Sequence, residues 1–100
     1  AAAAASELES ITTIYTSPAL VASAAVARGT VELARGRPEE ALHHLRRARR
    51  TWTEIDMPFE LARTRTLLSR AHAALGDGEE AAMEERAAQA ITSRITHPGP

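Results

Sequence analysis

Four short breaks divide a sequence that otherwise consists of strong helix-forming residues. The breaks read TSP (residues 16–18), GRPEE (36–40), DMPFE (56–60) and GDGEE (76–80). Proline and acidic residues in these breaks suit the first turn of a helix, and glycine suits the end of the helix before it. The breaks predict five helices, over residues 2–16, 18–35, 38–55, 58–75 and 78–95. Because only two or three residues link them, neighbouring helices are expected to be antiparallel.

Each predicted helix has apolar residues at helical spacing, which indicates one buried face. These stripes are Ala41, Leu45, Ala48, Trp52 and Ile55 in 38–55; Leu61, Leu68, Ala71 and Leu75 in 58–75; Leu20, Ala24, Ala27, Val31 and Ala34 in 18–35; and Leu8, Ile11 and Tyr15 in 2–16. Alternating runs typical of strands are missing. The predicted fold class is all-α, an antiparallel helix-pair stack in which alanines allow close packing. Trp52, Phe59 and Tyr15 are expected to pack in the core or between repeats.

The composition argues against several classes of protein. The chain has 22 alanines, no lysine and no cysteine, and its formal net charge is −1. Without an excess of positive charge, direct binding of nucleic acid is not expected. Without cysteine, disulfides and thiolate metal sites are excluded. The sequence lacks an apolar stretch of membrane-spanning length and the features of a signal peptide, so we expect a cytoplasmic location and no membrane interaction.

The sequence repeats itself over its length. GRPEEA at 36–41 aligns with GDGEEA at 76–81 when the chain is shifted by 40 residues. The same shift places the small residue Gly29 on the small residue Ser69, and Ala48 on Ala88. A period of this length in a helical chain predicts helix pairs that stack on one another to bury their apolar faces.

The repeated residues resemble the tetratricopeptide motif. That motif has a small residue in the first helix of a pair, a glycine at its end, and two alanines seven positions apart in the second helix. The matching positions are Gly29, Gly36, Ala41 and Ala48 in one copy, and Ser69, Gly76, Ala81 and Ala88 in the other. The usual tyrosine of the first helix is replaced by Glu32 or His72, and the large residue of the second helix is Leu45 or Glu85. The resemblance therefore implies a tetratricopeptide-like α-solenoid of about five helices rather than a regular array.

Residues 27–90 also resemble the helical-repeat region of large ATP-dependent, LuxR-type bacterial transcriptional regulators, the MalT-like group. The pattern W…MPFELARTR…L…A…ALGD…A, between Trp52 and Ala81, carries this resemblance. In such regulators the region lies between an ATP-binding module and a DNA-binding helix-turn-helix, and receives an inducer or partner. The sequence contains no GxxxxGK[ST] motif and no separate helix-turn-helix after residue 95. We expect residues 1–96 to be one repeat domain of a longer regulator and residues 97–100 to be a disordered tail or linker.

The resemblance also implies a binding surface, because the first helix of each tetratricopeptide pair lines a concave groove. Carried over to this chain, the groove residues are Ser23, Val26, Thr30, Leu33, Arg63, Thr66, Arg70 and Ala73. The last four share one helical face, and arginines there could grip a carboxylate or an acidic peptide. The alternative is that further parts of a longer array cover this face.

A second candidate surface lies in the stretch EEALHHLRRARRTW, residues 39–52. Arg46, Arg47, Arg49 and Arg50 surround the apolar stripe, and Arg46, Arg47 and Arg50 form a candidate basic outer face. We favour a solvated face, with binding of phosphate or an acidic partner as the alternative. His43 and His44 are adjacent on a helix and cannot share one metal ion, although His72 could approach one of them.

No residue pattern indicates catalysis, a cofactor or a metal. The sequence therefore predicts a non-catalytic interaction or scaffolding domain of a LuxR-type regulator. The expected partner is a protein, either a second copy in a homodimer or another part of a longer chain. The alternatives are a sensor of a small inducer in the groove and a stand-alone adaptor.

Overall fold

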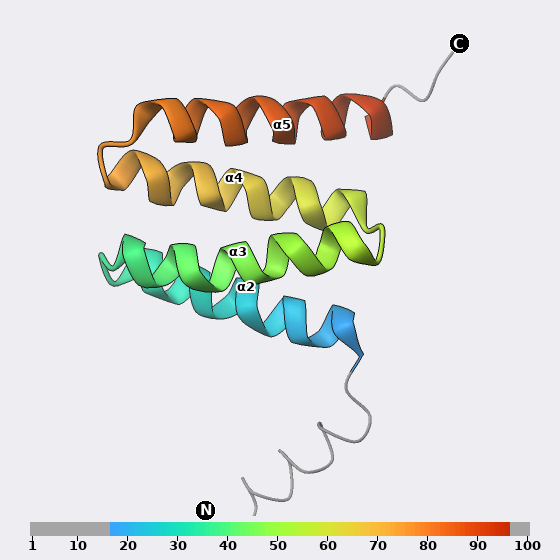
Figure 1. The fold of residues 1–100 in the computed structure, drawn as a ribbon, viewed down its shortest axis with the longest axis horizontal. Coiled ribbons are helices and arrows are strands. Elements are labelled where there is room, and N and C mark those ends of the chain that lie inside the picture. Colours follow the sequence, from blue (N-terminus) through green and yellow to red (C-terminus); the bar gives the residue numbers. More distant parts are fainter. Residues whose placement is uncertain (1–16, 97–100) are drawn as a thin grey trace, which may run out of the picture.

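The computed structural model describes residues 17–96, which form four helices joined by short turns (Figure 1). The helices are α2 (Pro18–Ala34), α3 (Pro38–Glu54), α4 (Pro58–Ala74) and α5 (Gly78–Thr96). They form the antiparallel all-α stack that the sequence predicts, and their ends lie within one residue of the predicted ends. Each helix packs against the next, and α2 also contacts α4. The predicted helix 2–16 and the tail 97–100 lie outside the described residues.

The helices begin at the residues that the breaks predict. A proline occupies the first turn of α2, α3 and α4, where its missing N–H is no loss. Ser17 caps α2, because its side-chain oxygen accepts a hydrogen bond from the backbone amide of Leu20 at 3.2 Å. Acidic residues in the first turns of α3, α4 and α5 interact favourably with the positive end of the helix dipole.

The three turns between helices share one backbone geometry. The middle residue of each turn has a positive φ, which is 73° at Gly36, 55° at Asp56 and 78° at Gly76. The next amide donates a hydrogen bond back into the preceding helix, from Arg37 to Glu32, from Met57 to Trp52 and from Asp77 to His72, at 2.8, 2.9 and 2.9 Å. This arrangement closes the helix end and reverses the chain within three residues, which places neighbouring helices antiparallel.

The core is centred on the predicted stripe of α3. Its members Ala41, Leu45 and Ala48 are 0% exposed, and Trp52 is 2% exposed. One cluster joins Ala41, Leu42 and Leu45 to Leu68 and Ala71 of α4, and a second joins Ala48 and Trp52 to Ala22 and Ala25 of α2. Helix α3 therefore lies between its two neighbours and contributes large side chains to both clusters.

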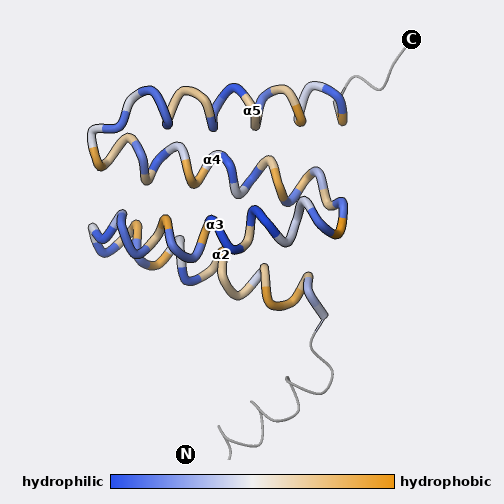
Figure 2. Tube along the Cα trace, in the orientation of Figure 1, coloured by the Kyte–Doolittle hydropathy of each residue, from blue (hydrophilic) through white to orange (hydrophobic). Residues whose placement is uncertain are grey.

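The buried face of α2 differs from the predicted one. The predicted stripe of Leu20, Ala24, Ala27, Val31 and Ala34 is exposed. Helix α2 instead buries Ala22, Ala25 and Gly29. The prediction was wrong because most residues of α2 are apolar, so helical spacing alone permits more than one face. The close approach of α3 selects the face with the smallest side chains and leaves hydrophobic residues uncovered near the start of α2 (Figure 2).

Two further sequence expectations are wrong. Phe59 is 60% exposed and does not pack with Trp52 in the core. Leu75 is 41% exposed, because it lies at the end of α4 beyond the cluster that buries Leu68 and Ala71. Tyr15, the third aromatic residue assigned to packing, lies outside the described residues.

A buried ion cluster connects the last three helices. Glu84 of α5 is 1% exposed, and its Oε1 accepts hydrogen bonds from Nη1 of Arg49 on α3 at 2.8 Å and from Nη1 of Arg65 on α4 at 3.0 Å. The two arginine side chains are 33% and 25% exposed. Pairing offsets the cost of removing the carboxylate from water, and it links α5 to two helices at once.

Candidate functional site

Five of the eight predicted groove residues surround one hollow between α2 and α4. We call this hollow the α2–α4 groove, and its volume is about 360 Å³. It is lined by Val26, Thr30, Arg63, Thr66, Leu67 and Arg70. Leu67 is absent from the sequence prediction. Its position four residues after Arg63 and three before Arg70 places it on the same helical face, so helical spacing was a sufficient signal.

The other three predicted residues do not line this groove. Ser23 and Ala73 are exposed elsewhere on α2 and α4. Leu33 is half-buried and packs against the cluster that contains Leu45 and Leu68. Leu33 therefore contributes to the packing of α2 on its neighbours. The groove in the structure is shorter than the surface that the sequence predicts.

The polar groups of the groove differ in what they can offer a ligand. The hydroxyl of Thr30 donates to the carbonyl of Val26 at 2.8 Å, and the hydroxyl of Thr66 donates to the carbonyl of Ala62 at 3.2 Å. Each hydroxyl can still accept a hydrogen bond but has already used its donor. Positive charge and further donors come from Arg63 and Arg70.

The two groove arginines are two helical turns apart on α4, and both are exposed. Arg63 lies 3.8 Å from the carboxylate of Glu60 in a solvated pair, which contributes little stability. Among residues 17–96, Arg70 has no ion-pair partner. The groove therefore has an apolar floor of Val26 and Leu67 and an available cation, an arrangement suited to an anionic ligand with an apolar part.

The candidate basic outer face is a continuous strip of α3. Arg46, Arg47 and Arg50 are exposed and line a shallow hollow together with Glu39, Leu42 and His43. Within the described part of the chain, none of these three arginines forms an ion pair. Arg49, which the sequence analysis did not assign to this face, turns inward to Glu84. A hollow formed by one helix alone encloses a ligand less than the α2–α4 groove, which has two walls.

The histidines do not form a metal centre in the described residues. The rings of His43 and His44 lie edge to face with centroids 5.3 Å apart. His72 is 4% exposed, and its Nδ1 lies 3.6 Å from Oδ2 of Asp77. Between residues 17 and 96, no three His, Cys, Asp or Glu side chains are grouped closely enough to hold a metal ion.

The repeat positions have the packing that the motif requires. Ala41 and Ala48 are fully buried, and Ala81 and Ala88 are 9% and 3% exposed. The family model of the tetratricopeptide repeat matches residues 20–93. The chain belongs to the tetratricopeptide repeat family. Comparisons with curated proteins and with solved structures found no match.

Tetratricopeptide repeats generally mediate protein–protein interaction and are typically non-catalytic scaffolds. One departure of this chain from the repeat motif, the glutamate at the position of a large second-helix residue, lies next to the buried ion cluster. Glu85, at the position of the large second-helix residue, is only half-buried, and the adjacent Glu84 enters the core with its two arginines. Among the described helices, none combines the length and apolar character that crossing a bilayer requires.

Proposed function

We propose that this tetratricopeptide domain binds an acidic segment of a partner protein in the α2–α4 groove. The observation that carries the proposal is the position of Arg63 and Arg70 beside an apolar floor, with Arg70 unpaired among the described residues. Carboxylates of the partner would pair with the guanidinium groups, and an apolar side chain would contact Val26 and Leu67. The domain itself performs no chemistry and acts as a scaffold.

We further propose that the domain serves a signal-responsive transcriptional regulator of the LuxR type. The support is the resemblance of residues 27–90 to the repeat region of those regulators. The apolar residues Leu20, Val21 and Val31 on the exposed face of α2 support a covered end of the stack, by a second copy or by other parts of a longer chain. A light-scattering mass equal to one chain at high micromolar concentration would argue against the second copy.

A small anionic inducer is the second candidate ligand. The volume of the α2–α4 groove, 360 Å³, falls within the range of small-molecule sites. Thermal unfolding with citrate, glutamate and a sugar phosphate separates this sensor function from scaffolding. A rise in melting temperature of several degrees with one of these compounds favours sensing, since a ligand that binds only the folded state stabilises it.

The acidic-segment proposal is tested with a fluorescently labelled oligoglutamate peptide that contains leucines. We expect the variant with Arg63→Ala and Arg70→Ala to bind at least about tenfold more weakly than the wild type, because two charge-assisted contacts are lost. The matched control is Arg46→Ala with Arg50→Ala, which removes the same charge from α3. Retained binding in the groove variant together with lost binding in the control would overturn the proposal and favour the basic outer face.

A further inference from the structure

The turn between α3 and α4 uses different residues from the other two turns. At the position of positive φ, Gly36 and Gly76 have no Cβ, whereas Asp56 holds a φ of 55° with one. Aspartate tolerates this conformation better than most residues, but glycine adopts it without steric cost. The following residue is Met57, which is 40% exposed, whereas the other turns place Arg37 and Asp77 there. The other two turns have glycine at the position of positive φ, and this turn does not. Departures of this kind from local sequence preference often occur at functional sites.

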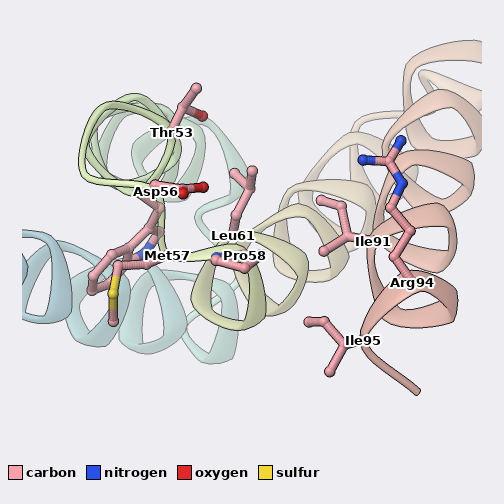
Figure 3. Close-up of a pocket in the computed structure, with 9 residues that line it drawn as sticks. Thr53, Asp56, Met57, Pro58, Leu61, Ile91, Arg94 and Ile95 are labelled. Atoms are coloured by element: carbon pink, nitrogen blue, oxygen red, sulfur yellow. The ribbon is translucent and has the colours of Figure 1, made fainter. Parts of the chain in front are cut away.

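A pocket of about 400 Å³ lies beside this turn. Its walls come from the end of α3, the first residues of α4 and the last turns of α5, and we call it the Asp56–Arg94 pocket. Figure 3 shows Asp56 on one side and Arg94 on the other, with Pro58, Leu61 and Ile91 between them. The pocket shares no lining residue with the α2–α4 groove. Leu61 and Arg63 are two positions apart on α4 and point about 160° apart around the helix, so the two sites use different faces of α4.

The pocket is apolar between two charges of opposite sign. Met57, Pro58, Leu61, Ile91 and Ile95 form the apolar walls. Ile95 is 43% exposed, so the pocket presents uncovered hydrophobic surface. Within residues 17–96, neither the Asp56 carboxylate nor the Arg94 guanidinium has an ion-pair or hydrogen-bond partner. Trp52, buried at the same pocket, has an indole N–H without an acceptor.

We propose that the Asp56–Arg94 pocket is a second docking site, which binds a peptide segment of a partner protein with an aliphatic side chain between a basic and an acidic residue. The aliphatic side chain fills the space between Leu61 and Ile91, the basic residue pairs with Asp56, and the acidic residue pairs with Arg94. Charge complementarity fixes the direction of the segment, because a peptide with the two charges exchanged meets like charges on both sides. A chain with this pocket and the α2–α4 groove can hold two segments at once.

The test is selection of a random linear peptide library on the full chain and on the variant Arg94→Glu. On the wild type, we expect enrichment of sequences with a basic, an aliphatic and an acidic residue in constant order. On Arg94→Glu, the acidic position should become lysine or arginine. The matched control is Arg86→Glu, an exposed arginine of the same helix that does not line the pocket, and it should select the wild-type sequences.

A labelled copy of the enriched peptide then measures affinity. Asp56→Asn keeps a residue that tolerates positive φ but removes the charge. We expect it to weaken binding by about two- to fivefold, as loss of one solvent-exposed ion pair would. The groove variant with Arg63→Ala and Arg70→Ala should bind this peptide as the wild type does. Absence of an enriched pattern, or a pattern that Arg94→Glu leaves unchanged, would overturn the second site. Peptides whose binding depends on the groove arginines alone would overturn it while supporting the proposed function.

Discussion

A Cβ atom on Gly29 of α2 would lie 2.7 Å from Cγ and Cδ2 of Leu45 on α3. Contacts this short do not occur between real side chains, and Leu45 is 0% exposed within the core. The hydrogen of Gly29 therefore allows α2 to approach α3 closely. In the second repeat, Ser69 takes the equivalent position, and its hydroxyl donates to the carbonyl of Ala81 at 2.8 Å. The two helices of each pair thus pack closely in both repeats, through the missing side chain of Gly29 in one and through the hydrogen bond of Ser69 in the other.

Gly29→Ala should lower the free energy of unfolding by about 1–2 kcal/mol, because overpacking outweighs the gain in helix propensity. The control is Gly78→Ala, where a new Cβ has no atom within 4 Å. That variant should be unchanged or slightly more stable. Urea unfolding followed by the fluorescence of Trp52, the only tryptophan, measures both. Equal stability of the two variants would mean that Leu45 can move aside.

Glu84→Gln should destabilise the fold by about 1–3 kcal/mol, below the range for fully buried pairs because both arginines are partly solvated. The substitution keeps the volume of the side chain but leaves Arg49 and Arg65 without their shared carboxylate. Glu85→Gln, one residue later and half-buried, should change stability by less than about 0.5 kcal/mol. If both variants unfold at the wild-type urea concentration, the ion cluster contributes nothing to stability.

Asp56→Gly should raise the free energy of unfolding by about 0.5–1 kcal/mol, since glycine adopts the positive φ of the turn without strain. Asp56→Asn should stay close to the wild type, because asparagine tolerates the same conformation. Circular dichroism during thermal unfolding measures these differences. The same Asp56→Gly variant should lose affinity for the peptide of the Asp56–Arg94 pocket. A less stable Asp56→Gly variant would contradict the idea that Asp56 is kept at a cost to the fold.

Charge reversal on the outer face of α3 should leave the fold intact. Arg46→Glu with Arg50→Glu should change the free energy of unfolding by no more than about 1 kcal/mol, because both side chains are exposed and unpaired. Ala48→Leu, in contrast, places a large side chain where exposure is 0% and should cost about 1–3 kcal/mol or prevent folding. Far-ultraviolet circular dichroism and urea unfolding compare them. The reverse order of stabilities would contradict the assignment of these two faces.

Local chemistry in the sequence was sufficient to predict the helices and the core of α3. Prolines, Ser17 and the turn residues act within a few positions of themselves, so the helix ends could be predicted to within one residue. The stripe from Ala41 to Trp52 was predictable because arginines and glutamates occupy the remaining faces of α3 and leave one choice. Arg63, Thr66 and Arg70 could be grouped for a similar reason, because helical spacing places them on one face.

Only the tertiary structure decided which face of a helix packs against its neighbouring helix when more than one face is suitable. Helix α2 is apolar on more than one face, and the approach of Leu45 to Gly29 selects the face that is buried. Arg49 and Arg50 are adjacent arginines of α3, yet only Arg49 reaches the carboxylate of Glu84, which is 35 residues away in sequence. The Asp56–Arg94 pocket likewise joins helix ends that are distant along the chain. The sequence determined how each helix forms, because capping and periodicity are local, whereas the contacts between helices depend on how all of them fit together.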